Sequence, residues 1–237
     1  MEAIAYAFYY IIPYIAVVVF FGGIIYQISR WRQVGVPPVR MSLFPRPEGR
    51  LARLLDALVD MFTLKGLWKV NKPLWIGSFI MHLGLLLLLT GHIRVFNDLD
   101  FVWNLLNWSP EQVDQFSKVA GITAGLLFMF PLFYLLARRF SGAVKWLSTP
   151  EDFFVLFLLI GIAITGNHMR FLTHVSVEQV NDFFRGLATF RWVDPPISAG
   201  QSFIYHFAFV QLLMIYFPFG KLMHTIGTVF AKMVARS

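Results

Sequence analysis

The feature that most constrains this chain is a set of five long stretches that contain no Asp, Glu, Lys or Arg. Each stretch has at least 17 residues, and about 20 helical residues cross the hydrocarbon core of a bilayer. Only 14% of the residues are charged, whereas soluble domains have about 25%. We therefore expect an all-α integral membrane protein, a single domain over residues 1–237, with five transmembrane helices in the cytoplasmic (inner) membrane. These helices are predicted at about 3–29, 73–93, 119–137, 153–172 and 197–220.

The basic residues between these helices predict the orientation of the chain. Of the 20 Lys and Arg residues, 15 fall in the connections on one side of the membrane and 5 on the other. The basic side is normally cytoplasmic, so we expect the N-terminus outside and the C-terminus in the cytoplasm. The first apolar stretch is longer than a signal-peptide core and is not preceded by basic residues, which favours a retained anchor. The net charge of +7 is therefore a topology signal, and we expect no nucleic-acid partner.

Two segments outside the predicted spans have recognisable patterns. Apolar residues at helical spacing over about 48–66 predict an amphipathic helix that follows a proline-rich, extended segment. This helix is expected to lie on the cytoplasmic lipid surface. Alternatively, it docks a soluble subunit. The sequence "SPEQ" at 109–112 predicts a helix start, with Ser109 as N-cap and Gln112 three residues later.

Four of the six histidines lie in or at the ends of the second and fifth predicted helices, at His82, His92, His206 and His224. An ionisable group inside a membrane is a candidate functional residue, although any one histidine could simply hydrogen-bond to a neighbouring helix. The two helices are antiparallel in the predicted topology, so each brings one histidine toward each side. His92 and His206 form the outer pair, and His82 and His224 form the inner pair.

The spacing of these histidines fits two bis-histidine haems in a bundle of helices 2 to 5. Ten residues separate His82 from His92, which is ~15 Å along a helix and ~80° around it. Eighteen residues separate His206 from His224, which is ~27 Å on one helical face unless Pro218 kinks the helix. Haem iron takes axial ligands from facing helices. A zinc ion would need its ligands at one level, and a proton relay would more often use carboxylates, which these helices lack.

Two further features bear on the haem hypothesis. Four glycines in the predicted bundle would either admit a flat macrocycle or allow ordinary close helix packing, namely Gly84, Gly91, Gly121 and Gly125. The chain has no cysteine, which excludes disulfides, a thiolate-ligated iron–sulfur cluster and a cysteine nucleophile within this chain but not in a partner.

The histidine motifs resemble those of a known family. "MHLGLLLLLTGH" and the later "HFAFVQLLMIYFPFGKLMH", together with "IPYIAVVVFFGG" near the start, are similar to the gamma subunits of respiratory nitrate reductase. These are five-helix cytochromes b that oxidise quinol. The resemblance implies two haem b groups, with His92 and His206 on the outer iron and His82 and His224 on the inner iron. It also implies an electron-transfer subunit of a quinol/quinone oxidoreductase complex, with no catalytic residue of its own.

Within this family, "LSTPEDFFVLFLLIGIAITGNHMRF" looks more like the DsrM branch, the membrane cytochrome b of the Dsr sulfur-metabolism complex. That resemblance implies a cytoplasmic iron–sulfur partner of the heterodisulfide-reductase-like DsrK type, further Dsr subunits, and menaquinone as the favoured quinone. Quinol would react near the outer haem and electrons would leave from the inner haem. A true nitrate reductase gamma subunit is the alternative. A haem-free anchor or transporter, in which the histidines only pack, is the alternative from another class.

One departure from the family pattern concerns the quinone site. Nitrate reductase gamma subunits use a lysine in the outer segment between helices 2 and 3, and the alignment puts Asp114 there. The candidate quinone-site residues are therefore Gly91, His92, Lys118, His168 and Arg170. Arg170 would contact a quinone carbonyl or a haem propionate, whereas the structural alternative is an interfacial arginine beside a solvated His168. His168 and His174 are candidate proton acceptors for quinol and weaker candidates for extra haem ligands.

Overall fold

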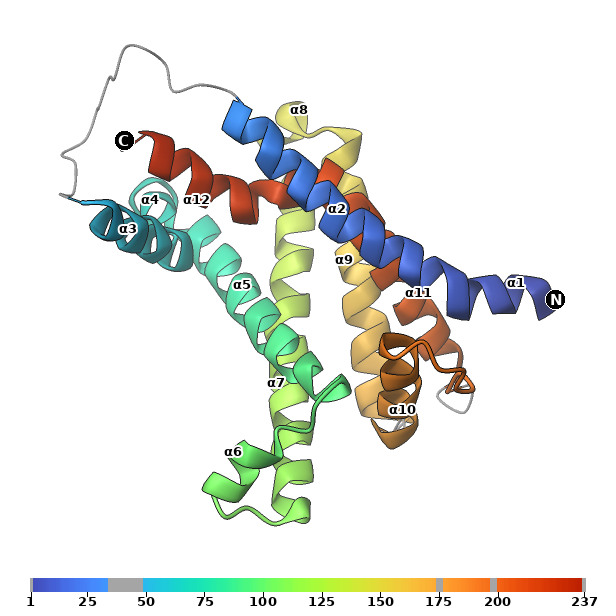
Figure 1. Ribbon diagram of the computed structural model, residues 1–237. Helices are drawn as coiled ribbons and strands as arrows, with labels where there is room; N and C mark the ends of the chain where they lie inside the picture. The colour runs from blue at the N-terminus through green and yellow to red at the C-terminus, as the bar shows by residue number, and fades with distance from the viewer. Residues whose placement is uncertain (1, 34–48, 174–176, 197–199, 236–237) are drawn as a thin grey trace. The chain divides into compact units, whose positions relative to one another are not determined.

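The computed structural model describes residues 2–33, 49–173, 177–196 and 200–235, and these residues form helices and turns with no strand among them (Figure 1). Among the described residues, five helices are long and apolar enough to cross a membrane, which confirms the predicted class of a five-helix, multi-pass membrane protein. They are Ile4–Gln33, Lys72–Val95, Pro110–Arg139, Pro150–Leu172 and Gly200–Phe219. The orientation and the single domain remain predictions. The proline-rich segment before residue 49 and His174 lie outside the described residues.

The chain divides into two compact units, and unit 1 consists of residues 1–10 and 77–210. It contains α1 (Glu2–Tyr6), most of α5 (Lys72–His92), α7 (Pro110–Arg139), α9 (Pro150–His168) and the first part of α11 (Gly200–Tyr216). The shorter helical segments are η2 (Ile93–Val95), α6 (Asp100–Leu105), α8 (Val144–Leu147), the π-helical η3 (Met169–Thr173) and α10 (Val177–Ala188). The π-helical segment η1 (Ala7–Ile11) also belongs to unit 1, except for its last residue.

The core of unit 1 joins α5, α7 and α9. Phe128 and Leu132 of α7 are buried against Ile160 and its neighbours on α9, and Leu85 of α5 packs on this cluster. A Cβ added at Gly84 would lie 2.6 Å from the backbone nitrogen of Phe128. Helix α5 therefore approaches α7 at backbone distance, as small residues permit between membrane helices.

Helix α7 begins earlier than its apolar stretch indicates, at Pro110 rather than near residue 119. The predicted helix start at Ser109 is confirmed, because the Ser109 hydroxyl accepts from the Gln112 backbone and the Gln112 side chain accepts from the Ser109 backbone at 2.8 Å. Such a capping box satisfies N–H groups that lack helical partners. The charged first turns and the apolar span are thus one continuous helix.

A second layer of unit 1 is aromatic. Phe183 of α10 is 1% exposed and makes edge contacts with Tyr9 of η1 and with Phe203 and Phe207 of α11. The Tyr10 hydroxyl donates to the Val193 carbonyl at 2.9 Å. These contacts hold the start of the first span against α10 and the start of α11.

Unit 2 consists of residues 11–76 and 211–237. It contains α2 (Ile12–Gln33), α3 (Arg50–Thr63), α4 (Lys65–Val70), the first residues of α5, the end of α11, η5 (Phe217–Phe219), η6 (Lys221–Met223) and α12 (His224–Ala235). The amphipathic segment predicted at 48–66 is helix α3, which packs against α12 (Figure 1).

The fifth predicted helix is interrupted, and this corrects the spacing expected for its two histidines. Helix α11 ends at Tyr216, two short 3-10 segments follow, and α12 begins at His224. Pro218 at the break lacks an N–H group and cannot continue the hydrogen bonds of a helix. Unit 2 holds the break in place, because Gln27 donates to the Pro218 carbonyl at 3.0 Å and Gly23 leaves room for the proline ring. The eighteen-residue calculation therefore does not apply.

Candidate haem site

Two of the four predicted ligands, His92 and His206, lie opposite one another in unit 1. His92 is the last residue of α5, and His206 lies near the start of α11. Their imidazole rings are nearly parallel, with an interplanar angle of 11°, and their centroids are 6.3 Å apart. Helices distant in the sequence thus place two imidazoles at one level of the unit.

Backbone hydrogen bonds define which nitrogen of each ring faces a ligand. The Nδ1–H of His92 donates to the Leu88 carbonyl at 2.7 Å, and that of His206 lies 3.1 Å from the Ile162 carbonyl. Because a carbonyl oxygen only accepts, the proton is on Nδ1 and the lone pair is on Nε2. Histidines that bind metals usually donate their other ring N–H in this way.

The separation of the two rings fits a metal ion between them. With a metal–nitrogen bond of ~2.0 Å and ~1.1 Å from nitrogen to ring centroid, trans imidazoles have centroids ~6 Å apart. The observed 6.3 Å agrees with this value. Gly166 of α9 gives His206 its room, because a Cβ there would lie 3.1 Å from His206 Cε1. The residues present therefore fit an iron ion that His92 and His206 would hold together.

Thr165 adds a second contact to the His206 ring. Its Oγ1 lies 3.1 Å from His206 Nδ1 and donates its own proton to the Gly161 carbonyl at 2.7 Å. The threonine oxygen is thereby oriented to accept from the imidazole. This arrangement would restrict rotation of the ring about its helix.

The four glycines singled out in the sequence divide into two groups. At three of them, other protein groups occupy the space beside the glycine. These groups are the Phe128 backbone at Gly84, the Arg170 guanidinium at Gly121 and the Asn167 side chain at Gly125. These glycines allow close packing, the second alternative considered for them. Nothing lies within 4 Å of a Cβ added at Gly91, next to His92.

The other predicted ligands, His82 and His224, fall in different units. The Nδ1–H of His82 donates to the Ser78 carbonyl at 2.7 Å on α5, and that of His224 donates to the Lys221 carbonyl at 2.9 Å at the start of α12. All four histidines therefore have the same ring protonation pattern. Among the described residues, no group of three or more His, Asp and Glu side chains comes together as a zinc centre would require.

The quinone-site candidates of unit 1 have varied partners. Arg170 of η3 is half-buried and donates from Nη2 to the Ser117 carbonyl at 2.6 Å, one residue before Lys118 on α7. His168 is exposed, and its Nδ1 lies 2.8 Å from Ser202 Oγ on α11. Lys118 is exposed. The structure thus joins Arg170 to α7 and His168 to α11.

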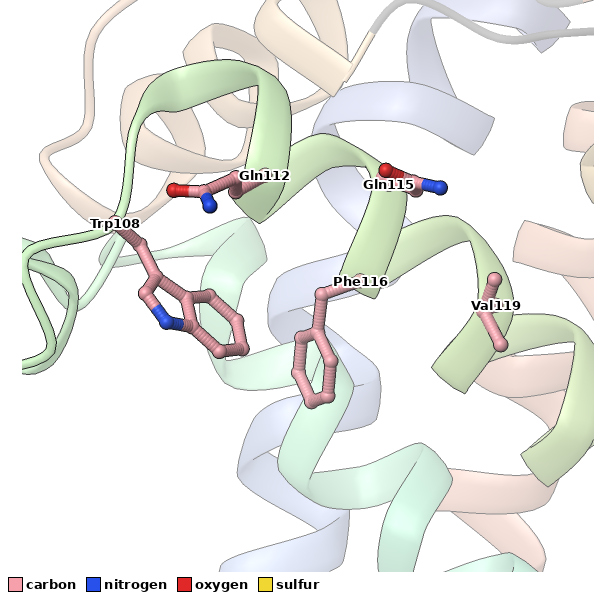
Figure 2. Close-up of a pocket in the computed structure, with 5 residues that line it drawn as sticks. All are labelled: Trp108, Gln112, Gln115, Phe116 and Val119. Carbon is pink, nitrogen blue, oxygen red and sulfur yellow. The ribbon is translucent and has the colours of Figure 1, made fainter.

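A shallow groove of about 320 Å³ lies along the first turns of α7 (Figure 2). Its lining residues are Trp108, Gln112, Gln115, Phe116 and Val119. At ~100° per residue, the lining side chains of α7 lie away from Ser117 and Gly121, the residues that contact Arg170. Trp108 also stacks with Trp103 at 5.7 Å, an aromatic pair suited to a membrane–water interface. The groove is therefore on another face of α7 from the Arg170 contact.

Several residues near the histidine pair were not singled out in the sequence, namely Arg94, Ser117, Thr165 and Gly166. Two features of the sequence could have pointed to them. Arg94 is two residues after His92, and Thr165 and Gly166 begin the motif "TGNHMR". Their contacts depend on how α9 and η3 pack against α7 and α11, which periodicity alone does not determine.

Comparison with known proteins agrees with this architecture. Residues 67–236 match the nitrate reductase gamma subunit family. The chain is 31% identical to the Hdr-like menaquinol oxidoreductase cytochrome b-like subunit of Archaeoglobus fulgidus, over 93% of this chain and 76% of the relative. Its identity to the protein of the same name from Archaeoglobus profundus is 26%, over 94% and 76%. It is 27% identical to the nitrate reductase gamma chain of Bacillus subtilis, over 90% and 87%.

The five spanning helices and these relatives define a class, the membrane electron-transfer subunits of the cytochrome b type. Because the family match covers well over half of the chain, the protein belongs to the nitrate reductase gamma subunit family.

Proposed function

We propose that this protein is a dihaem cytochrome b that exchanges electrons between the quinone pool and a cytoplasmic iron–sulfur partner in sulfur metabolism, as in the DsrM branch. His92 and His206 would hold one haem b, and His82 and His224 would hold the other. Haem b supplies reversible one-electron transfer when it is bound. The protein's own contribution is to hold the ligands and to exclude water from the bundle.

The observation that carries the proposal is the pair of parallel imidazoles at His92 and His206, 6.3 Å apart between centroids. Each ring is held by a backbone carbonyl in the tautomer that presents Nε2. Paired ligation explains both features.

The inner pair is supported by the sequence and by local geometry. His82 and His224 are the remaining histidines of the two ligand-bearing spans, and each donates from Nδ1 to a carbonyl as His92 does. The predicted antiparallel topology puts both on the cytoplasmic side. We therefore assign them to the second haem.

Quinol would bind near His92 and Gly91, where the surface beside α5 is open. Lys118, His168 and Arg170 remain the other candidates for this site. Menaquinone is favoured as the quinone, because the Archaeoglobus relatives are named as subunits of a menaquinol oxidoreductase. The Hdr-like part of that name supports a heterodisulfide-reductase-like partner, of the DsrK type, docked on the basic cytoplasmic face together with further Dsr subunits.

The quinone step is tested by mixing the purified, oxidised full-length protein with menadiol under anaerobic conditions. We expect the absorbance bands of reduced haem b to appear, and the single substitution His92→Ala to abolish the fast phase. Arg191→Gln is the matched control, because this exposed side chain is bonded to Thr189 and not to the histidine pair. Haem that dithionite reduces but menadiol does not would contradict the quinone assignment.

A second candidate is a true gamma subunit of a respiratory nitrate reductase, which the Bacillus subtilis relative favours through its coverage of 87% of that protein. Affinity purification of the tagged protein from its native membrane separates the two. A co-purifying heterodisulfide-reductase-like iron–sulfur protein supports the first proposal. A co-purifying molybdenum enzyme supports the second.

A further inference from the structure

Two arginines of unit 1 converge on one serine of α7. Arg94 of η2 donates from Nη1 to the Ser117 hydroxyl, and Arg170 of η3 donates from Nη2 to the Ser117 carbonyl at 2.6 Å. Arg170 lies close against α7 because residue 121 is glycine, where a Cβ would be 2.8 Å from Arg170 Nε. The fold therefore holds two guanidinium groups within one turn of α7, although both are positively charged.

Little negative charge lies close to this arginine pair. Asp98 lies 3.7 Å from Arg94, but it is also 3.0 Å from Arg185. In the described part of the chain, no carboxylate lies within 4 Å of the Arg170 guanidinium, and Asp114 acts on it only at longer range. Charges withdrawn from water are normally paired. Because Arg94 shares its one close aspartate with Arg185, a further anion beside Arg94 and Arg170 would be electrostatically favourable.

One donor of the pair is also unsatisfied. The Nε–H of Arg94 is buried and has no acceptor among the described residues. Leaving a buried charged donor without an acceptor is costly, and such groups usually mark a ligand or a functional role. The N–H group without an acceptor therefore belongs to one of the two arginines that have few carboxylates nearby.

We propose that Arg94 and Arg170 form a carboxylate-binding site whose ligand is the propionate pair of the haem held by His92 and His206. This inference rests on the proposed function. Arg94 is two residues after His92, and Arg170 is four residues after Gly166, where an added Cβ would lie 3.1 Å from the His206 ring. Haem carries two carboxylates, and a guanidinium binds a carboxylate through two parallel N–H groups. Arg94 and Arg170 are positioning residues that also fix the charge near the iron.

The expected effect of this site is on the reduction potential. A nearby positive charge disfavours the more positive, oxidised iron, so its loss shifts the equilibrium toward the oxidised form. We expect Arg94→Gln and Arg170→Gln each to lower the potential of one haem and leave the other in place. A shift of about tenfold in the reduction equilibrium corresponds to about 59 mV for one electron.

The test is a redox titration of the purified full chain, followed by visible absorbance, with haem counted per chain. Arg170→Lys keeps the positive charge but loses the bidentate contact with a carboxylate. The haem potential of this variant should therefore lie between those of wild type and Arg170→Gln. Arg170→Lys also serves as the folded variant if the glutamine substitution prevents assembly. Arg191→Gln is the matched control for removing an arginine charge in unit 1, and it should leave both potentials unchanged.

The outcomes separate this inference from the proposed function. Wild-type protein without haem overturns both. Wild-type protein with two haems, whose potentials do not move in Arg94→Gln and Arg170→Gln, overturns the carboxylate site alone. If the potentials stay fixed while native mass spectrometry shows loss of a co-purifying anionic phospholipid, the anion is a lipid phosphate and the propionate assignment is wrong.

Discussion

At the scale of single residues, the proposal depends on the histidines and on which ring nitrogen of each carries the proton. Each of these four donates from Nδ1 to a backbone carbonyl, His206 to Ile162 of α9 and the other three to a residue three or four positions earlier in the chain. That leaves Nε2 as the nitrogen with the lone pair. The sequence predicted which histidines to consider, but not their hydrogen-bond partners.

His92→Ala and His206→Ala should each remove one axial ligand from the same haem. We expect each variant to retain about one haem per chain instead of two, since iron coordination depends on both ligands. The pyridine haemochrome assay gives the count. Arg191→Gln is the control, because this exposed side chain is bonded to Thr189 and its loss should keep both haems. Equal loss in all three variants would mean that the bundle, and not ligation, is being disrupted.

Thr165→Val should weaken the hold on the His206 ring. The substitution removes the hydroxyl that lies 3.1 Å from His206 Nδ1 while preserving the shape of the side chain. Loss of such outer contacts costs about 10–100-fold in metal affinity, so haem should be lost faster to a haem-scavenging protein. Thr90→Val provides the comparison, because Thr90 bonds only to its own helix at Leu86. Identical rates of haem loss in the two variants would mean that the Thr165 hydroxyl stabilises only its own helix and does not hold the His206 ring.

At the scale of helices, the sequence predicted the elements better than their ends. The five spans follow from their lack of charge, and the start of α7 was recognisable at Ser109 because capping uses local chemistry. The length of α7 was underestimated because its first turns carry Glu111, Asp114 and Lys118. The break near Pro218 was anticipated only as a kink, since the contacts that stabilise it come from α2 in another part of the chain.

The contact between α2 and this break predicts different outcomes for two adjacent glycines. A Cβ at Gly23 would lie 2.5 Å from the rigid ring of Pro218, whereas nothing lies within 4 Å of one at Gly22. Overpacking costs about 1–3 kcal/mol, while Gly→Ala within an open helix is favourable by about 1 kcal/mol. Gly23→Ala should therefore lower the free energy of unfolding in detergent, and Gly22→Ala should not. Two variants of equal stability would show that α2 does not hold the proline.

At the scale of the whole molecule, the residues on each side of the membrane can be tested directly because the chain has no cysteine. Asn104 is predicted outside and Ser141 in the cytoplasm, and both are exposed. Single Asn104→Cys should react with a membrane-impermeant maleimide in intact spheroplasts. Ser141→Cys should react only after permeabilisation, and the cysteine-free wild type is the blank. The reverse pattern would invert the proposed path of electrons.

The sequence was sufficient to predict the family of the whole protein, but not every site in it. The family and the membrane cytochrome b class could be recognised because the histidine spacings and the apolar spans are linear features of the chain. The arginine pair on Ser117 could not, because its members come from three separate segments. Ligand roles and the quinone site remain predictions for experiment.

The central claim, that four histidines hold two haems, is tested most directly by the reduced-minus-oxidised visible spectrum of the purified protein with haem counted per chain. We expect the bands of low-spin haem b and two haems per chain. A folded protein without colour would contradict it, and the histidines would then be helix-packing residues.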